Sequence, residues 1–114
     1  MFAAHYKLSN LCVIIDRNGL QIDGACKDVM SAEPIESKMK AFGFNTVVID
    51  AHDFNSIENG FAMARNEKSR PTAIIANSIK GKGVSFMENA VCWHGTAPSD
   101  EQYTIAMQDL KEVK

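Results

Sequence analysis

Residues 11–24 read LCVIIDRNGLQIDG, and this stretch decides the fold. It opens with the short apolar run Leu11 to Ile15, in which polar and apolar residues do not alternate. Continuous runs of this length, rich in β-branched residues, are typical of parallel strands that are buried on both faces. A polar loop follows at once and contains two turn dipeptides, Asn18-Gly19 and Asp23-Gly24. The stretch therefore predicts a buried strand that ends in a tightly turning loop.

Two further apolar runs, Thr46 to Ile49 and Thr72 to Ile75, have the same character. Helical patterns separate the three runs, so the order of strands and helices predicts two right-handed crossovers. We therefore expect a three-layer α/β fold, a parallel sheet with flanking helices, in a single domain over residues 1–114. Leu11 to Ile15 should lie between the other two strands or beside one of them. Open α/β sheets bind ligands at the carboxyl ends of their strands, which here carry Asp16, Asp50 and Asn77.

Capping residues predict where the two crossover helices begin or end. Ile35, Met39 and Phe42 follow helical spacing, and Gly43 is the expected stop. Asp53 is the expected N-cap of the next helix. The apolar stripe of that helix consists of Ile57, Phe61 and Ala64.

The two ends of the chain also follow helical spacing. Ser99 and Gln102 form a capping box, and the apolar face of the helix that follows consists of Tyr103, Ala106, Met107 and Leu110. Met1 to Leu8 resembles the last turns of an amphipathic helix that has no preceding cap. We therefore expect a strand and a loop upstream of Met1, and a truncated gene product or a fragment would account for this start.

Composition argues against several classes of protein. A net charge of −2 and a pI near 5.9 give no electrostatic case for binding nucleic acid. No signal peptide is recognisable and the apolar runs are strand-sized, so no membrane partner is expected. Cys12, Cys26 and Cys92 form no CxxC pair, which fits a reducing cytoplasm. Cys12, within the first apolar run, is expected to be an inert buried residue.

The loop from Asp16 to Gly24 is the densest candidate for chemistry, and local chemistry leaves two interpretations open. It can be a tight turn in which Asn18 tolerates unusual backbone angles. It can also be a metal loop, because Mg²⁺ prefers oxygen ligands and usually includes phosphate oxygens among them. The side-chain oxygen of Asn18 and a backbone carbonyl two residues later could supply two such ligands, with Gly19 letting the backbone fold close to the ion.

Two other segments are candidate sites. Ser78 to Ser85 is rich in lysine and glycine, but it is not a Walker loop, because the upstream glycine is absent and Lys82 is followed by glycine. In Cys92-Trp93-His94-Gly95, nothing supports a Cys/His nucleophilic pair. His94 suits a role as phosphate donor or proton carrier, although a hydrogen-bonded structural histidine is the simpler interpretation. His5 and His52 are taken as structural.

Together these segments resemble the transketolase family in its two-gene form. The loop from Asp16 to Gly24 resembles the end of the thiamine-diphosphate motif, which opens with Gly-Asp-Gly and closes at an asparagine about one βα unit later. The resemblance continues in order along nearly the whole chain, in Ala41 to Phe44, Arg70 to Thr72, Lys80 to Asn89 and Trp93 to Pro98. It implies the second half of a thiamine-diphosphate-binding fold, in the N-terminal subunit of a split transketolase.

The resemblance also implies roles for four residues. Asn18 would give its side-chain oxygen and Leu20 its backbone carbonyl to Mg²⁺ or Ca²⁺. Ile22 would press on the rings of thiamine diphosphate, and His94 would approach the diphosphate and the reacting sugar as the catalytic residue. In this family, which includes enzymes of the pentose phosphate pathway, the cofactor carries a two-carbon unit from a ketose to an aldose while the protein orients it.

The chain departs from the family pattern in ways that leave alternatives open. The Gly-Asp-Gly opening is absent, and with it the aspartate expected as the third protein ligand. The pyrimidine-binding domain, a separate chain in the two-gene form, is the expected partner, together with a homo-oligomer and sugar-phosphate substrates. A 1-deoxyxylulose-5-phosphate synthase-like enzyme is one alternative, although Val84 to Asn89 and Trp93 to Gly95 look more like transketolase. A non-catalytic assembly fragment that retains only the fold is the other, and the missing aspartate favours it.

Overall fold

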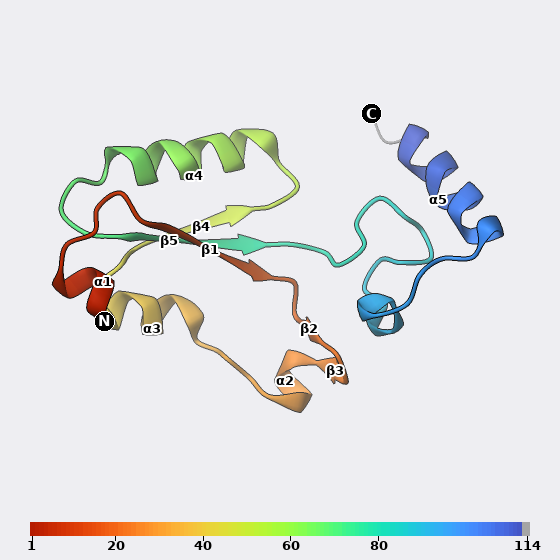
Figure 1. Ribbon diagram of the computed structural model, residues 1–114, viewed down its shortest axis with the longest axis horizontal. Coiled ribbons are helices and arrows are strands. Elements are labelled where there is room, and N and C mark those ends of the chain that lie inside the picture. Colours follow the sequence, from red (N-terminus) through yellow and green to blue (C-terminus); the bar gives the residue numbers. More distant parts are fainter. Residues whose placement is uncertain (113–114) are drawn as a thin grey trace. The chain divides into compact units, whose positions relative to one another are not determined.

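The computed structural model describes residues 1–112, except for the side chain of Glu112, and Figure 1 shows its helices and strands. The chain forms two compact units, which are described separately. The first unit consists of residues 1–17 and 32–78, and the second of residues 18–31 and 79 onward.

The first unit is built on a three-stranded parallel sheet. Its strands are β1 (Cys12–Arg17), β4 (Asn45–Asp50) and β5 (Thr72–Asn77), in the order β1-β5-β4. Ile74 on the central strand is in register with Ile14 on one side and Val47 on the other. The predicted parallel sheet is therefore confirmed, and the first apolar run lies beside one other strand rather than between two.

Helices cover both faces of this sheet, as the sequence predicts. The first unit contains α1 (Phe2–His5), α3 (Ile35–Ala41) and α4 (Phe54–Asn66). Both α3 and α4 pack against β4 and β5, and Figure 1 shows them on opposite faces of the sheet. Asp53 caps α4 as expected, because its carboxylate accepts the Asn55 N–H at 3.0 Å. The three-layer α/β architecture is thus confirmed.

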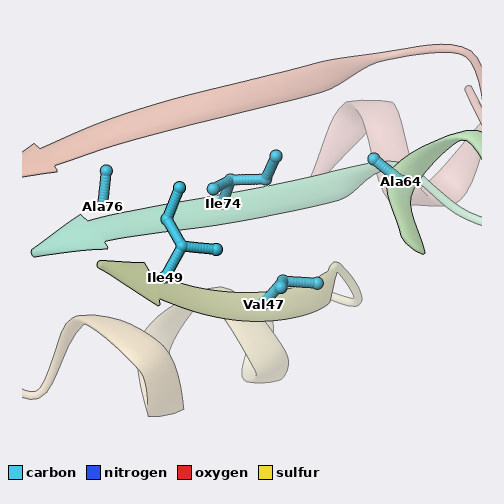
Figure 2. Close-up of a cluster of buried hydrophobic side chains, with 5 residues drawn as sticks. All are labelled: Val47, Ile49, Ala64, Ile74 and Ala76. Atoms are coloured by element: carbon cyan, nitrogen blue, oxygen red, sulfur yellow. The ribbon is translucent and has the colours of Figure 1, made fainter. Parts of the chain in front are cut away.

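The core of the first unit lies between the sheet and α4. Figure 2 shows the buried cluster formed by Val47, Ile49, Ala64, Ile74 and Ala76. The predicted stripe residues Ile57 and Phe61 pack against this cluster. Gly60 lets the helix approach closely, since a Cβ placed there would lie 2.7 Å from Cγ2 of Ile49.

The expected burial of the first strand is wrong. Cys12 is exposed, and Ile14 has 56% of its surface exposed, whereas residues 72–76 of β5 are buried. The physical reason is position: β1 is an edge strand, and α3 and α4 pack on β4 and β5. Partial burial still raises the pKa of the Cys12 thiol. A run of apolar residues therefore identifies a parallel strand but not its place in the sheet.

The second unit contains small elements joined by turns. They are the antiparallel pair β2 (Leu20–Gln21) and β3 (Gly24–Ala25), α2 (Cys26–Val29), the 3₁₀ turn η1 (Val91–His94) and α5 (Asp100–Glu112). The capping box before α5 is confirmed. The Ser99 N–H donates to Oε1 of Gln102 at 2.9 Å, and the Gln102 N–H donates to Oγ of Ser99 at 3.3 Å. On the predicted apolar face of α5, Tyr103, Met107 and Leu110 are exposed.

No helix among residues 1–112 is long and apolar enough to span a membrane.

Candidate cofactor-binding site

Asn18 forms a tight turn directly after β1. Its Oδ1 accepts the Leu20 N–H at 2.9 Å, and Gly19 adopts a φ of +76°, in the left-handed region. The Gly19 carbonyl accepts the Cys26 N–H at 2.9 Å, which closes the turn from the other side. The half-buried Asn18 side chain is therefore held in one orientation. An amide oxygen has two lone pairs, so this hydrogen bond is compatible with binding a cation as well.

Ile22 lies at the exposed tip of the β2–β3 ribbon. Leu20 pairs with Ala25 and Gln21 with Gly24, which leaves Ile22 and Asp23 in the connecting turn. The Ile22 side chain is 64% exposed. The sequence thus places an apolar side chain on the surface within four residues of the Asn18 turn, where it could meet an apolar ligand group.

His94 is the last residue of η1, and its side chain is exposed. Trp93, the residue before it, is half-buried and donates its indole N–H to the Phe86 carbonyl at 3.0 Å. The turn η1 packs against β2, which begins at Leu20. The structure therefore brings two of the expected site segments together within the second unit. Whether the side chains of Asn18 and His94 meet at one ligand stays a prediction.

The donor set for a metal ion is neutral. No group of three or more His, Cys, Asp or Glu side chains that could hold a metal ion occurs within residues 1–112. Asn18 and Leu20 offer an amide and a backbone oxygen, which fit a hard cation such as Mg²⁺ or Ca²⁺. Mg²⁺ sites usually include one or two carboxylates and phosphate oxygens. These residues can thus complete a metal site but not form one alone.

The remaining candidates lie elsewhere. His5 follows no strand and belongs to α1. The His52 backbone N–H donates to Oδ1 of Asp50 at 2.8 Å, just beyond β4. Cys92 is exposed, and its carbonyl accepts the Thr96 hydroxyl at 2.9 Å. A surface hollow of about 520 Å³ on α5 includes none of the expected site residues, being lined by Tyr103, Thr104, Met107, Gln108 and Lys111.

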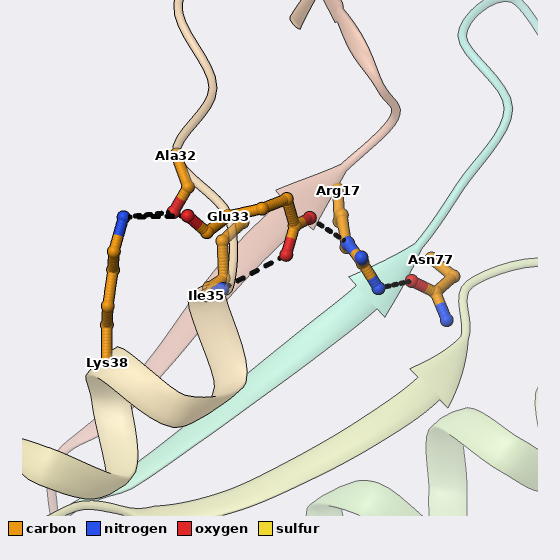
Figure 3. A network of polar contacts seen from close by, with 6 residues as sticks. All are labelled: Arg17, Ala32, Glu33, Ile35, Lys38 and Asn77. Carbon is orange, nitrogen blue, oxygen red and sulfur yellow. Dashed lines mark hydrogen bonds and ion pairs between the residues drawn. The ribbon is translucent and has the colours of Figure 1, made fainter. Parts of the chain in front are cut away.

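Sequence reasoning missed a polar network at the carboxyl edge of the first unit's sheet, which Figure 3 shows. Arg17 Nε lies 2.6 Å from Oε1 of Glu33, and Arg17 Nη1 donates to Oδ1 of Asn77 at 3.4 Å. Oε2 of Glu33 accepts the Ile35 N–H at 3.1 Å. The Ile35 N–H, and next the Arg17 guanidinium, hold the pKa of Glu33 below its usual range. A polar residue ending a strand was the available signal, but its partner sixteen residues later was not predictable.

A small cavity adjoins this network. It measures about 190 Å³, with Arg17 and Glu33 in its wall and Val48 and Ile75 contributing apolar surface. Ligand pockets for small molecules usually occupy about 300–1,000 Å³. The cavity is therefore small for a cofactor, and the network is best understood as a link between the end of β1 and the start of α3.

Comparison with known proteins identifies the family. The family model described as "transketolase, thiamine diphosphate binding domain" matches residues 1–111. One of the two chains of the apulose-4-phosphate transketolase of Phocaeicola vulgatus is 38% identical over 112 residues, which are 98% of this chain and 40% of that protein. The 6-deoxy-6-sulfo-D-fructose transketolase subunit SqwG of a Clostridium species is 34% identical over 112 residues, 98% of this chain and 41% of that protein.

The fold agrees with the sequence. The crystal structure of transketolase from Campylobacter jejuni superposes with a TM-score of 0.89 at 26% identity, covering 96% of this chain and 17% of that chain. This chain spans about 40% of the length of the transketolase subunits that it resembles. The resemblance inferred from the sequence motifs is therefore confirmed. The chain belongs to the transketolase family, within its thiamine-diphosphate-binding domain.

Proposed function

We propose that this chain contributes to one subunit of a two-chain transketolase, which transfers a two-carbon ketol unit from a ketose to an aldose. One observation carries the proposal: 98% of the chain matches proteins whose names identify them as transketolase subunits. The match reaches from the N-terminal helix to α5, so it is not confined to one motif. Sugar phosphates are the proposed substrates, because phosphorylated and sulfonated sugars appear in the names of these relatives.

Within this function, the chain would help to bind and orient thiamine diphosphate and its metal ion. The Asn18 side-chain oxygen and the Leu20 carbonyl would bind Mg²⁺ or Ca²⁺. The Asn18 turn supports this role, because the Leu20 N–H already fixes the orientation of the amide. Ile22 would contact the cofactor rings, and its exposure leaves that surface accessible. These roles follow the family resemblance residue by residue.

His94 is the proposed catalytic residue. Its imidazole is exposed at the end of η1, where it can donate a hydrogen bond to a phosphate oxygen or exchange a proton with a sugar hydroxyl. The bound cofactor would supply the electron-sink chemistry, and the protein supplies orientation and proton transfer. Because η1 packs against β2, movement of His94 relative to the metal-binding turn is restricted.

A second chain would complete the enzyme. The proposed partner is the pyrimidine-binding chain of the split form, with pairs of such complexes forming a homo-oligomer. The alternative function is a non-catalytic assembly piece. It is favoured by the absence, within residues 1–112, of a side-chain cluster able to hold a metal ion. No described feature favours a 1-deoxyxylulose-5-phosphate synthase-like activity over transketolase.

NMR titration of the full chain tests the cofactor role. Thiamine diphosphate and Mg²⁺, each added to about 10 mM to detect weak binding, should shift the side-chain signals of Asn18 and His94. Thiamine without the diphosphate should shift neither. Asn18→Ala should abolish the Mg²⁺-dependent part, whereas Asn59→Ala, on the exposed side of α4, should not. A chain whose Asn18 and His94 signals ignore the cofactor would support the assembly alternative.

A further inference from the structure

Residues 80–89 form a loop that closes on itself. The Asn89 N–H donates to the Lys80 carbonyl at 2.9 Å, which brings the two ends of the segment together. Inside it, the Val84 N–H donates to the Gly81 carbonyl at 3.1 Å. The segment contains turns but no helix or strand. Compact surface loops whose ends meet are Ω-loops, and they are frequently functional.

Glu88 fastens the middle of this loop. Its Oε1 accepts the Gly83 N–H at 3.0 Å and lies 3.4 Å from Nζ of Lys82. The lysine is 46% exposed, so the ion pair itself contributes little. A carboxylate that accepts a backbone N–H forms a charge-assisted bond, which is stronger than a neutral one. The contact with Gly83 is therefore the main constraint that Glu88 provides.

Polar contacts matter here because the second unit has a thin apolar core. Among the described residues, Val84 is the only hydrophobic side chain of this unit that is buried; the other buried hydrophobic residues lie in the first unit. Hydrophobic burial is the main source of stability in most folds. With so little burial, the shape of the 80–89 loop depends on its internal hydrogen bonds.

Trp93 seats η1 on this loop. Its indole N–H donates to the Phe86 carbonyl at 3.0 Å, and the Phe86 and Trp93 rings lie 5.2 Å apart between centroids. Trp93 is half-buried while His94, the next residue, is exposed. The anchored ring therefore fixes the backbone from which the His94 side chain extends. A change in the 80–89 loop should be transmitted to His94 through Trp93.

We infer that Glu88 and Trp93 are positioning residues for His94. Glu88 holds the 80–89 loop in one shape, and Trp93 transfers that shape to the turn that carries the imidazole. The inference rests on the proposed function only for the claim that His94 meets thiamine diphosphate. The physical link between Glu88, Trp93 and His94 is a property of the chain without any ligand.

NMR spectra of the ligand-free chain test this link. The chain contains one tryptophan and three histidines, so the indole N–H of Trp93 and the ring signals of His94 can be followed separately. Glu88→Ala should move the His94 ring signals and speed exchange of the Trp93 indole proton by about tenfold or more, as expected for loss of a charge-assisted hydrogen bond. Glu88→Gln keeps an oxygen acceptor for the Gly83 N–H and should restore both signals. Trp93→Phe should move the His94 signals even though Glu88 is intact.

Internal and matched controls separate positioning from general destabilisation. His5 and His52 belong to the first unit, so their ring signals should stay in place in every variant. Glu67→Ala removes another carboxylate that accepts a backbone N–H, that of Ser69 at 2.8 Å, and should leave His94 unchanged. If Glu88→Ala leaves the His94 and Trp93 signals where they are in the unmodified chain, or if His5 and His52 move equally, the inference is overturned.

Adding thiamine diphosphate and Mg²⁺ to the same samples connects the link to function. The unmodified chain and Glu88→Gln should show the same shift of the His94 signals, and Glu88→Ala a shift that needs about tenfold more cofactor. Equal responses in all three would overturn the functional part of the inference. No response in the unmodified chain would overturn the proposed function instead, while the ligand-free spectra still decide whether Glu88 positions His94.

Discussion

Ser85 and Asp109 join the glycine-rich loop to the last helix. The hydroxyl and the backbone N–H of Ser85 both donate to Oδ2 of Asp109, at 2.7 and 2.8 Å. The two residues are twenty-four positions apart in sequence and belong to the same unit. The apolar face of α5 is largely exposed, so this double contact is a principal restraint on the helix.

Replacing Asp109 should loosen α5 without unfolding the sheet. Asp109→Ala removes the acceptor of both bonds, and amide exchange in residues 103–111 should become faster while residues 45–50 and 72–77 keep their protection. The matched variant Asp100→Ala lies in the first turn of the same helix and leaves the contact with Ser85 intact. Equal exchange rates in α5 for Asp109→Ala and the unmodified chain would contradict the restraint.

The same contact should depend on pH. The backbone N–H and the hydroxyl of Ser85 lower the pKa of Asp109. A carboxylate with a lowered pKa in the folded state contributes stability above its ordinary pKa and loses it as the pH falls through the lowered value. Protection of α5 should therefore persist through mildly acidic conditions and fall only below the usual range of aspartate. Exchange measured at a series of acidic pH values gives this profile.

Local patterns predicted the elements of this fold well. Non-alternating apolar runs located all three strands of the parallel sheet, and the caps at Asp53 and Ser99 formed as expected. Caps are predictable because the donor and the acceptor lie within a few residues of each other. The strand order β1-β5-β4 was not predictable, because it depends on contacts between residues far apart in sequence. The exposure of Cys12 follows from that order and was missed with it.

The candidate site shows the same division. The Asn18-Gly19 dipeptide predicted a turn, and the hydrogen bond between Asn18 and Leu20 is such a turn. The packing of η1 against β2 could be expected from the family resemblance but not from the residues alone. The bond from Trp93 to the Phe86 carbonyl left no signal in the sequence, since any carbonyl can accept an indole N–H.

Gly60 should resist replacement although it lies in a helix. Gly60→Ala gains about 1 kcal/mol of helix propensity, but the new Cβ would stand 2.7 Å from Cγ2 of Ile49. Overpacking of this kind costs about 1–3 kcal/mol, and the steric cost should exceed the gain, leaving a net loss of about 1 kcal/mol or more. Urea unfolding followed by far-ultraviolet circular dichroism measures the difference. Asn59→Ala, an exposed neighbour in α4, gains propensity without the clash and should not destabilise; a stabilised Gly60→Ala variant would contradict the close approach.

Gly19 and Gly81 form a matched pair within the second unit. Both adopt positive φ, +76° and +73°, so alanine at either position is strained by about 1–2 kcal/mol. They differ in space: a Cβ at Gly19 has no neighbour within 4 Å, whereas one at Gly81 would lie 2.4 Å from the Met87 carbonyl oxygen. Gly81→Ala should therefore cost clearly more than Gly19→Ala. Urea unfolding followed by the fluorescence of Trp93 compares them, and equal losses would show that the 80–89 loop is not closed as described.

The isolated chain should bind thiamine diphosphate and Mg²⁺ weakly. Asn18 and Leu20 provide two neutral oxygens, and the sequence lacks the Gly-Asp-Gly motif that supplies an aspartate in the family pattern. Mg²⁺ gives up water reluctantly and depends on carboxylate and phosphate oxygens, so a missing anionic ligand should weaken binding more than a missing neutral one. The loss of such a contact is on the order of 2–3 kcal/mol, or about a hundredfold in affinity.

Calorimetric titration of the chain with cofactor and Mg²⁺ measures this affinity directly. Asn18→Ala should reduce the remaining weak binding further, because it removes one of the two oxygens. Asn55→Ala, at the start of α4 in the first unit, should leave binding unchanged. Micromolar affinity, or two-carbon transfer measured without any added chain, would show that the two neutral oxygens suffice and that the missing carboxylate is not required.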